Sequence, residues 1–548
     1  MARIIPFPQP NSEGEPSQAE ETRFPGLYGK RLGLSDDQIA ALVSGDAQSR
    51  KAVFEVRTEI NVEAPDSIPV LRQTVALLQA VRKREPMRST AKGNLPAAVV
   101  KELFAGAFAD AEPGFVRVNR EGDSTVLMRV RLLAQKAGLL TKRRSEFSVT
   151  KTAVRALDSG NLGEIYRRLL EAHLRHPHDL DRFDRIPDGG MATRSLPLLL
   201  FAAWDDNGPY LYEEDFADLL AAILRGEGVS RADLEHAIAL RFFERFGVHF
   251  GLFVEGSRFE FPVEMPELVY YPFKRWRRTQ LFDQVFRRHV GPPALAVRYP
   301  EQAAADIMYD VHDMGGRLDG TEDVYLQALC LRAIERCPEE PDPYVVLARL
   351  YERKPERSLQ LADAGLAASS GRTPDVPAGA SPWLDHSYRD VIRLHFIRAE
   401  VLTQLGRTDE AFAEWETLLK IDPEDAIGAR HFYFPGLILS DQFNAAEQLL
   451  KRYPADPSTP ACWNRTLAAL VRDDTRTADA ELDAALEANP HVPAVLAARA
   501  LPDVGNYYAP WSYEEAVIYA EQAAPAWRHV SGAREWLRRR MQRRNQDP

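Results

Sequence analysis

Apolar and polar residues recur with a helical period through most of the C-terminal part of the chain, residues 322–540. Ala399 and Leu402 fall on one face of a predicted helix, and Ala411 and Trp415 fall on one face of the next. A glycine separates the two helices, and small residues at their crossing allow a close approach. Because neither helix can bury its apolar stripe alone, the pattern predicts helix pairs that stack on neighbouring pairs.

This pattern repeats with a period of 34 residues, which is the separation of Pro423 from Pro457. A period of 34, with small residues at the helix crossing and a proline that closes the second helix, is typical of tetratricopeptide repeats. We expect about four to six units between residues 322 and 540, enough for a stable solenoid. Pro435 falls inside a first helix, which we expect it to kink or split.

Two regions upstream follow a different order, in which three helices precede a pair of short strands. In residues 66–188 the third helix is capped by Ser124, and the strands LLTKR and EFSVT follow it. This is the order of the winged variant of the helix-turn-helix. Residues 190–290 repeat the order: Ser230 caps the third helix, and the strands HFGLFVEG and SRFEFPVE turn at residues 256–257.

The predicted fold class is therefore mainly α, with tandem winged-helix modules that carry small β-hairpins, followed by a tetratricopeptide-type α-solenoid. The divisions are a disordered tail (1–25), a docking helical segment (26–65), winged-helix-like module 1 with a helical extension (66–188), winged-helix-like module 2 (190–290), a linker or helical connection (291–321), a tetratricopeptide-like solenoid (322–540) and a second tail (541–548).

Composition and charge narrow the classes of function. The formal net charge of −11 argues against a general polyanion binder, although an acidic chain can still contain a basic module. Cys330, Cys337 and Cys462 are too few and too scattered for a disulfide framework or a four-thiolate zinc site. No run of about 18 apolar residues and no secretory pattern occurs, so we expect a cytoplasmic protein that does not enter the membrane.

The segment HLRHPHDLDRFD gathers side chains that are able to bind metal. They are His173, His176, His178, Asp179, Asp181 and Asp184. The segment has the character of a helix end and a loop, and no second ligand cluster follows at an obvious spacing, so we expect no metal site and no cofactor. The short patterns of phosphate-binding loops, zinc proteases and serine hydrolases are also missing, which disfavours an enzyme. Because convergent sites need no motif, an enzyme with an unrecognised site stays an alternative.

Module 1 carries a cationic run from its third helix through its hairpin. Its members are Arg129, Arg131, Lys136, Lys142, Arg143, Arg144, Lys151 and Arg155, with Glu146 as the one acidic residue. Such a run suits contacts with DNA phosphates, which release counterions when they are neutralised. Met128 and Leu132 on the outward face of the third helix suit a protein contact better. The two interpretations are a contact with duplex DNA and a solvated charged face on a packing module.

A second basic run surrounds Trp276 in the segment YYPFKRWRRTQLFDQVFRR. Basic residues around an aromatic ring can hold a nucleic-acid backbone while the ring stacks on a base. The alternative, which is more common for such runs, is a solvated face of a helix.

The stretch TAKGNLP, followed by AQKAGLLTKRRSEFSVTKTAVRAL, and the block NYYAPWSYEEAVIYAEQAAPAWRHVSGAREWL resemble a group of bacterial winged-helix plus tetratricopeptide-repeat proteins. Some of that group are labelled SEC-C-motif proteins. The resemblance covers most of the chain from about residue 68 onward. It implies an architecture and no particular activity. The metal-binding cysteine cluster that the SEC-C label implies is missing here, so no zinc-dependent role is carried over.

The first functional hypothesis is a non-enzymatic scaffold or adaptor whose solenoid binds a peptide or a partner domain, with no small-molecule substrate. Alignment of the repeats places these residues on the inner surface of the solenoid: Arg349, Arg353, Arg393, Phe396, Glu400, Gln404, Arg430, Phe434 and Trp463. Arginines near aromatic rings can hold a carboxylate by paired hydrogen bonds, so we expect an acidic or C-terminal peptide. The alternative is a transcriptional regulator that contacts duplex DNA through module 1.

Overall fold

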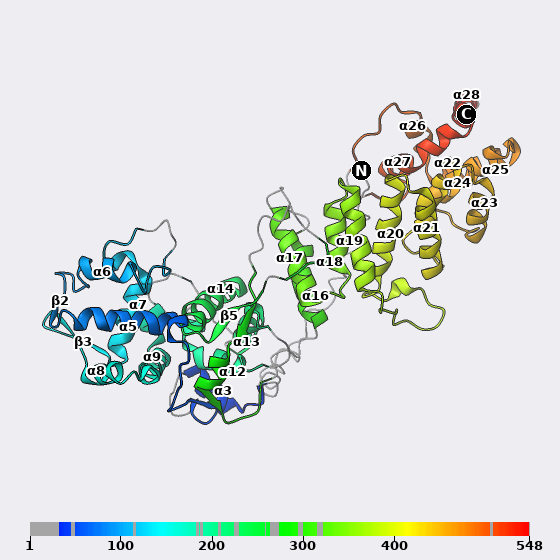
Figure 1. Ribbon diagram of the computed structural model, residues 1–548. Coiled ribbons are helices and arrows are strands. Elements are labelled where there is room, and N and C mark those ends of the chain that lie inside the picture. Colours follow the sequence, from blue (N-terminus) through cyan, green and yellow to red (C-terminus); the bar gives the residue numbers. More distant parts are fainter. Residues whose placement is uncertain are drawn as a thin grey trace. The chain divides into compact units, whose positions relative to one another are not determined.

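The computed structural model describes residues 32–44, 50–112, 117–181, 186, 190–205, 210–223, 229–257, 259–263, 273–293, 300–314, 322–504 and 508–546. Within these ranges the chain is mainly helical with a few short strands, as predicted (Figure 1). It forms two compact units, one drawn from residues 13–258 and 273–299 and the other mainly from residues 300–548. None of the helices described combines the length and the apolar character that a membrane crossing needs. The tail expected at residues 1–25 lies outside the described ranges.

The first part of the N-terminal unit has the order of helices and hairpin that we expected for module 1. Its elements are η1 (Pro65–Ser67), α5 (Pro69–Arg82), β2 (Met87–Arg88), α6 (Ala97–Phe104), η2 (Glu121–Asp123), α7 (Thr125–Lys136), β3 (Leu140–Arg143) and β4 (Glu146–Val149). The strands form an antiparallel sheet in the order β2-β4-β3. Ser124 caps α7, because its Oγ accepts a hydrogen bond from the backbone N–H of Leu127 at 3.1 Å.

Three further helices extend this part, and the last two of them pack on α7. The three helices are α8 (Lys151–Asp158), α9 (Leu162–Arg175) and α10 (Pro177–Asp181). Helix α9 packs on α5, α7 and α8, and α10 packs on α7 and α9. Leu132, which we expected to be exposed, packs against the core, and Met128 is half-buried. The third helix of module 1 is therefore enclosed by its own extension rather than free on the surface.

The second part of the N-terminal unit is built around a bundle of phenylalanines. Its elements are α11 (Met191–Arg194), α12 (Leu196–Ala202), α13 (Glu213–Ile223), α14 (Arg231–Ala237), the π-helix η3 (Ile238–Val248), β5 (Phe253–Glu255), β6 (Trp276–Arg278), α15 (Gln280–Val285) and β7 (Phe286–Arg288). Ser230 caps α14 as predicted, by accepting from the N–H of Asp233 at 3.1 Å. Phe242, Phe243 and Phe246 of η3 are all buried.

Two expectations for module 2 are wrong. Strand β5 pairs with β6, so that Glu255 lies opposite Trp276, and not with the segment SRFEFPVE that follows it. The basic run is therefore partly a strand instead of a helix face. Trp276 is fully buried, its ring stacks on Phe243 at 5.0 Å, and its Nε1 donates to Glu213 at 2.7 Å. A ring held in this way cannot stack on a base, because both its surface and its N–H group are already used.

The docking segment contains a strand as well as the expected helix. Helix α3 (Asp36–Ser44) packs on α12, and strand β1 (Phe54–Val56) pairs antiparallel with β7, with Phe54 opposite Arg288. The ring of Phe54 is buried, 5.5 Å from Trp204 and 5.8 Å from Phe286. The segment is therefore attached to the N-terminal unit by a helix face and by a sheet edge.

The C-terminal unit is a series of helices, with bounds as follows. They are α16 (Pro300–Met314), α17 (Glu322–Arg336), α18 (Asp342–Leu350), α19 (Pro355–Ala368), η4 (Pro382–Leu384), α20 (Arg389–Gln404), α21 (Thr408–Ile421), α22 (Ala429–Leu439), α23 (Phe443–Arg452), α24 (Thr459–Val471), α25 (Thr475–Ala488), α26 (Val492–Ala497), α27 (Tyr513–His529) and α28 (Ala533–Gln546).

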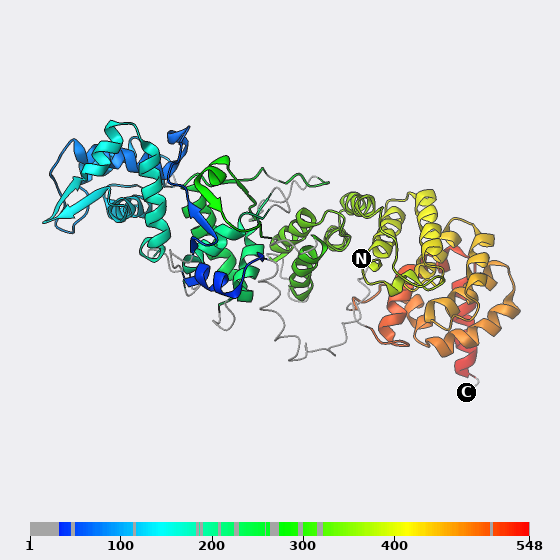
Figure 2. The ribbon, with the colours of Figure 1, turned by 90° about the horizontal axis from the view of Figure 1, so that it is seen from below.

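Successive helices of this unit pack in pairs, and the pairs stack (Figure 2). The first helices α18, α20, α22 and α24 also contact one another in turn. Small residues occur where helices cross. A Cβ added at Gly365 of α19 would lie 2.7 Å from the Cβ of Tyr344 and 2.8 Å from Cδ1 of Leu394. The helix pairs and the small residues at their crossings are as the hydrophobic pattern predicted.

Three details differ from the expected boundaries. Helix α16 packs on α17, so the segment 291–321, expected as a linker or helical connection, contains a helix that belongs to the helical series. Helix α28 continues to Gln546, so most of the expected tail at 541–548 is helical. Helix α22 runs through Pro435 without splitting.

Candidate functional site

A groove of about 810 Å³ lies on the first helices of the C-terminal unit. Its floor is a stripe on α22, where Phe432, Pro435, Gly436 and Leu439 follow at the i, i+3, i+4, i+7 spacing of one helix face. Helix α22 contacts both α20 and α27, so these two helices form the walls. The floor is apolar, and Gly436 allows the ring of Phe412 to approach, since a Cβ there would lie 3.1 Å from its Cε1 atom.

The walls carry polar side chains at the same helical spacing. They are Glu400, Thr403 and Gln404 on α20, and Glu515, Tyr519 and Gln522 on α27, where Ile518 adds an apolar side chain. An apolar floor between walls that offer a few fixed polar groups is typical of a ligand site.

Three of the nine residues that we expected on the inner surface line this groove, namely Glu400, Gln404 and Arg430. The aromatic candidates are core residues instead: Phe396 is 2% exposed, and Phe434 and Trp463 are 0% exposed. Their rings fill the space between stacked helices, because the face that carries them is the packing face of the pair. They are therefore not available to a ligand.

The arginine candidates make ion pairs within the chain, with one exception. Arg349 lies 2.7 Å from Glu400, and Arg393 lies 2.6 Å from Asp390. Burial raises the pKa of Glu400, and Arg349 opposes that rise. Burial, followed by the carboxylate of Asp342, raises the pKa of Asp390 to about 7. The exception is Arg353, which is exposed between α18 and α19 and does not line the groove.

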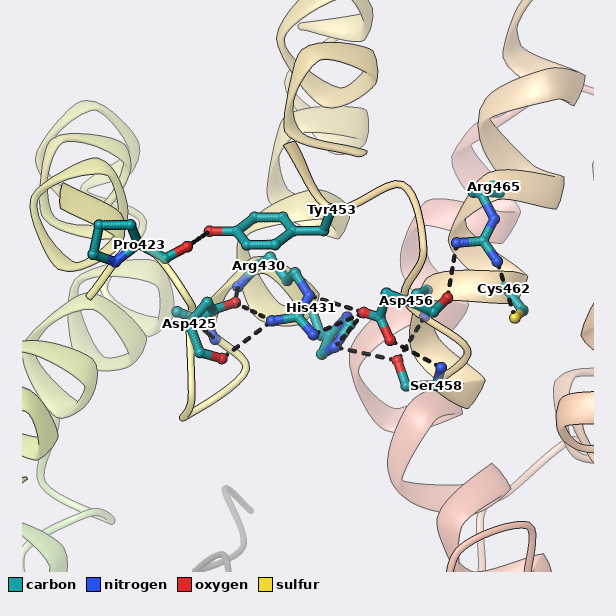
Figure 3. Close-up of polar contacts among 11 residues, drawn as sticks. Pro423, Asp425, Arg430, His431, Tyr453, Asp456, Ser458, Cys462 and Arg465 are labelled. Atoms are coloured by element: carbon teal, nitrogen blue, oxygen red, sulfur yellow. Dashed lines mark hydrogen bonds and ion pairs between the residues drawn. The ribbon is translucent and has the colours of Figure 1, made fainter. Parts of the chain in front are cut away.

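Arg430 is the centre of a buried cluster at one end of the groove (Figure 3). Its guanidinium donates to Oδ2 of Asp425 at 2.7 Å and to Oδ2 of Asp456 at 2.7 and 2.9 Å, and it lies over the ring of Tyr453 at 4.7 Å. Asp425 also accepts from the N–H of Ala429, at the start of α22. Arg430 thus joins the loop before α22 to the loop before α24.

His431 in the same cluster is held neutral. Burial, followed by the charge of Arg430, lowers the pKa of His431 to about 3. Its Nε2 lies 3.4 Å from Oγ of Ser458 and 3.5 Å from Oδ2 of Asp456. A Ser-His-Asp relay needs the serine and the aspartate on opposite ring nitrogens. Because one nitrogen faces both groups here, the cluster has the geometry of a structural network.

Glu515 is a groove residue that we did not identify from the sequence. Its Oε2 accepts three hydrogen bonds, from Thr459 Oγ1 (2.9 Å), Asn489 Nδ2 (3.2 Å) and the N–H of Trp511 (2.6 Å). The pattern Ser512-x-x-Glu515 is the available signal, and it is also that of a helix capping box. The sequence therefore suggests a local role for a side chain that in fact joins three helical elements.

The eight cationic candidates of module 1 separate into two groups of four. Arg129 is 7% exposed, and Arg131 makes an ion pair with Glu121. Lys136 lies 2.5 Å from Asp179, and Nζ of Lys142 donates to the carbonyl of Gly93 at 2.7 Å. Lys136 and Lys142 keep exposed surface despite these contacts. The other four candidates, Arg143, Arg144, Lys151 and Arg155, are exposed at the hairpin tip and on α8.

The segment with metal-capable side chains does not form a site. His173 is 2% exposed, its ring lies 4.7 Å from Phe246, and burial lowers its pKa well below the usual value. Asp179 pairs with Lys136, and Asp184 lies outside the described ranges. Across the part of the chain that the structure describes, no group of three or more His, Cys, Asp or Glu residues is arranged to hold a metal ion. The three cysteines are buried.

The groove and the hairpin tip with α8 are thus surfaces where several expected residues are accessible. Comparison of the chain with protein-family models, with curated proteins and with solved structures gives no match.

Proposed function

We propose that this chain is a cytoplasmic, non-enzymatic interaction protein, a scaffold or adaptor, whose tetratricopeptide-type solenoid binds a segment of a partner protein. The observation that carries the proposal is the groove of about 810 Å³ on the first helices, with its apolar floor on α22 and polar walls on α20 and α27. The 34-residue period and the stacked helix pairs support the repeat assignment. Repeat arrays use extended surfaces of this kind to hold their partners.

The contacts change which residues we assign to the ligand. Arg349, Arg393 and Arg430 already pair with carboxylates of the chain, so we do not propose that they hold a ligand carboxylate. We assign ligand binding instead to the apolar floor and to groove side chains that retain exposed surface, such as Gln404. Amide side chains can pair with the backbone of an extended peptide, while the floor receives its apolar side chains.

The test is whether peptides that the full chain selects from a random library lose their binding when Gln404 is replaced by tryptophan. Gln404 is exposed, so the larger ring fills the groove without disturbing the core. The matched control is Glu487→Trp, an equally exposed position on α25 that does not line the groove.

A second candidate function, contact with duplex DNA by a winged-helix module 1, is favoured by one observation. Arg143 and Arg144 are exposed at the tip of the β3–β4 hairpin, and Arg144 and Ser145 have φ values of 47° and 65°, which make a tight turn. Lys151 and Arg155 are exposed on the next helix. Because α7 is covered, this contact would use the hairpin and the phosphate backbone, not a recognition helix in the major groove.

A further inference from the structure

We propose that the groove selects a cationic segment, and that Glu515 receives the Lys or Arg side chain of that segment. This inference rests on the proposed function and names the chemistry of its ligand. All three hydrogen bonds to the Glu515 carboxylate go to Oε2, and within the described ranges Oε1 has no hydrogen-bond partner. A carboxylate that is fixed through one oxygen presents the other as a positioned acceptor.

The donors that hold Glu515 are all neutral. They are a threonine hydroxyl, an asparagine amide and a backbone N–H, and no ion pair of Glu515 is formed with the described residues. The side chain is therefore oriented by neutral donors alone. A hydrogen bond from a cation to an ionised carboxylate is about twice as strong as a neutral one, so a ligand cation gains more here than a neutral donor does.

Among the described residues that line the groove, Arg430 is the one Lys or Arg side chain. Glu400 is offset by Arg349, whereas the single cation Arg430 is shared by the two carboxylates Asp425 and Asp456. His431 is neutral, because burial and Arg430 lower its pKa to about 3. The described pairs therefore leave an excess of negative charge, which attracts a basic segment and repels an acidic one. The acidic peptide that we expected from the sequence is replaced by a basic one.

The neighbours of Glu515 define what accompanies the cation. Ile518, Tyr519 and Gln522 continue the same wall of α27 at the i+3, i+4 and i+7 positions, and the stripe on α22 forms the floor. Tyr519 itself is 2% exposed, so a ligand that places a cation at Glu515 runs its next residues past an aliphatic side chain and an amide. The expected ligand is a short segment in which one Lys or Arg is followed or preceded by apolar residues.

The experiment uses the full chain and a random dodecapeptide library displayed on phage. Enriched peptides are synthesised with a fluorescent label, and their affinities are measured by fluorescence anisotropy. We expect each to contain a Lys or Arg whose replacement by the uncharged norleucine weakens binding about ten-fold or more, which is the loss of one charge-assisted hydrogen bond. Because this change is made in the peptide, it cannot affect the folding of the chain.

The complementary change is Glu515→Gln, which keeps the shape and one acceptor oxygen. It should weaken the Lys or Arg peptide by the same factor and leave the norleucine peptide unchanged. The matched control is Glu514→Gln, which removes an equal charge from the adjacent residue of α27, outside the groove. It should leave both affinities unchanged.

Two outcomes overturn the inference, and they differ in what else they affect. If the enriched peptides have no conserved cation, or bind Glu515→Gln as tightly as the unaltered chain, the charge assignment is wrong while the groove stands. If no peptide is enriched, or if enriched peptides bind the Gln404→Trp chain as tightly as the unaltered chain, both the charge assignment and the proposed function are wrong.

Discussion

Nη2 of Arg430 on α22 lies 2.7 Å from Oδ2 of Asp456, which is in the loop between α23 and α24. The same guanidinium also holds Asp425, whose side chain is 1% exposed, while that of Asp456 is 9% exposed. Two carboxylates that are removed from water thus depend on one cation. This relationship connects α22 to α24 and also forms one end of the groove.

Replacement of Arg430 by alanine should therefore destabilise the C-terminal unit. Loss of the cation leaves buried carboxylates unpaired, a change that costs about 3–5 kcal/mol when a buried pair is broken. Urea unfolding followed by circular dichroism measures the cost. Arg476→Ala, at an exposed position on α25, is the control and should change the free energy of unfolding by less than about 0.5 kcal/mol. Equal stabilities of the two variants would show that the cluster is not structural.

Replacement of Gly365 by alanine should also destabilise this unit, because the stacking depends on a close crossing of helices at this residue. The new Cβ would lie under 3.0 Å from atoms of Tyr344 and Leu394, so the helices would have to separate. We expect a loss of about 1–3 kcal/mol, typical of overpacking. Gly371→Ala is the matched control, since a Cβ there meets nothing within 4 Å. An unchanged unfolding midpoint for Gly365→Ala would contradict the packing described.

The N-terminal unit should lose stability as the pH falls below about 6.5. Burial, followed by Arg129 and Arg72, lowers the pKa of His249 to about 3, whereas the unfolded side chain titrates near its ordinary value. Between these pH values only the unfolded state binds the proton. The free energy of unfolding therefore falls by about 1.4 kcal/mol for each unit by which the pH drops below 6.5.

Unfolding midpoints at pH 7.5 and 5.5 measure the dependence on His249. The variant His249→Gln should lose less stability between these pH values than the unaltered chain does. The control His236→Gln, at an exposed position, should lose as much stability as the unaltered chain. An identical pH dependence for all three chains would disprove the contribution of His249.

Changing Arg143 and Arg144 to glutamate should abolish binding of a short DNA duplex if the hairpin tip contacts phosphates. For the unaltered chain we expect log K to fall with log salt at a slope of about −0.9 per phosphate contacted. A gel-shift titration at several salt concentrations measures this slope. The control, Lys420→Glu with Arg476→Glu, makes an equal change of charge at exposed sites of the C-terminal unit. Absence of binding at low salt by the unaltered chain would remove this second candidate function.

Features that depend on neighbours in sequence could be predicted, and features that depend on distant partners could not. Ser124 and Ser230 cap their helices as expected, because a cap bonds to a backbone N–H three residues away. The prediction for Trp276 was wrong, because strand β6 pairs with β5. Residues 256–275 separate the two strands, and the sequence pattern does not predict a pairing across this interval.

The same limit applies to the groove. Helical periodicity identified the face of α22 that carries Arg430, but its partner Asp456 is in a loop 26 residues away. From the sequence alone, an arginine on a helix face is therefore interpreted as available to a ligand, because the position of the loop that carries its carboxylate partner is not known. Glu515 was missed for a related reason, because its donors come from α24, from the end of α25 and from the residue before its own cap.

The binding of selected peptides to the Gln404→Trp chain tests the central claim most directly. Fluorescence anisotropy would compare the unaltered chain, Gln404→Trp and the control Glu487→Trp with the same labelled peptide. If the groove on α20, α22 and α27 is the binding site, Gln404→Trp should bind at least about ten-fold more weakly, since the indole occupies space that the ligand needs. Glu487→Trp should bind as the unaltered chain does. Equal affinity of all three chains would contradict the account.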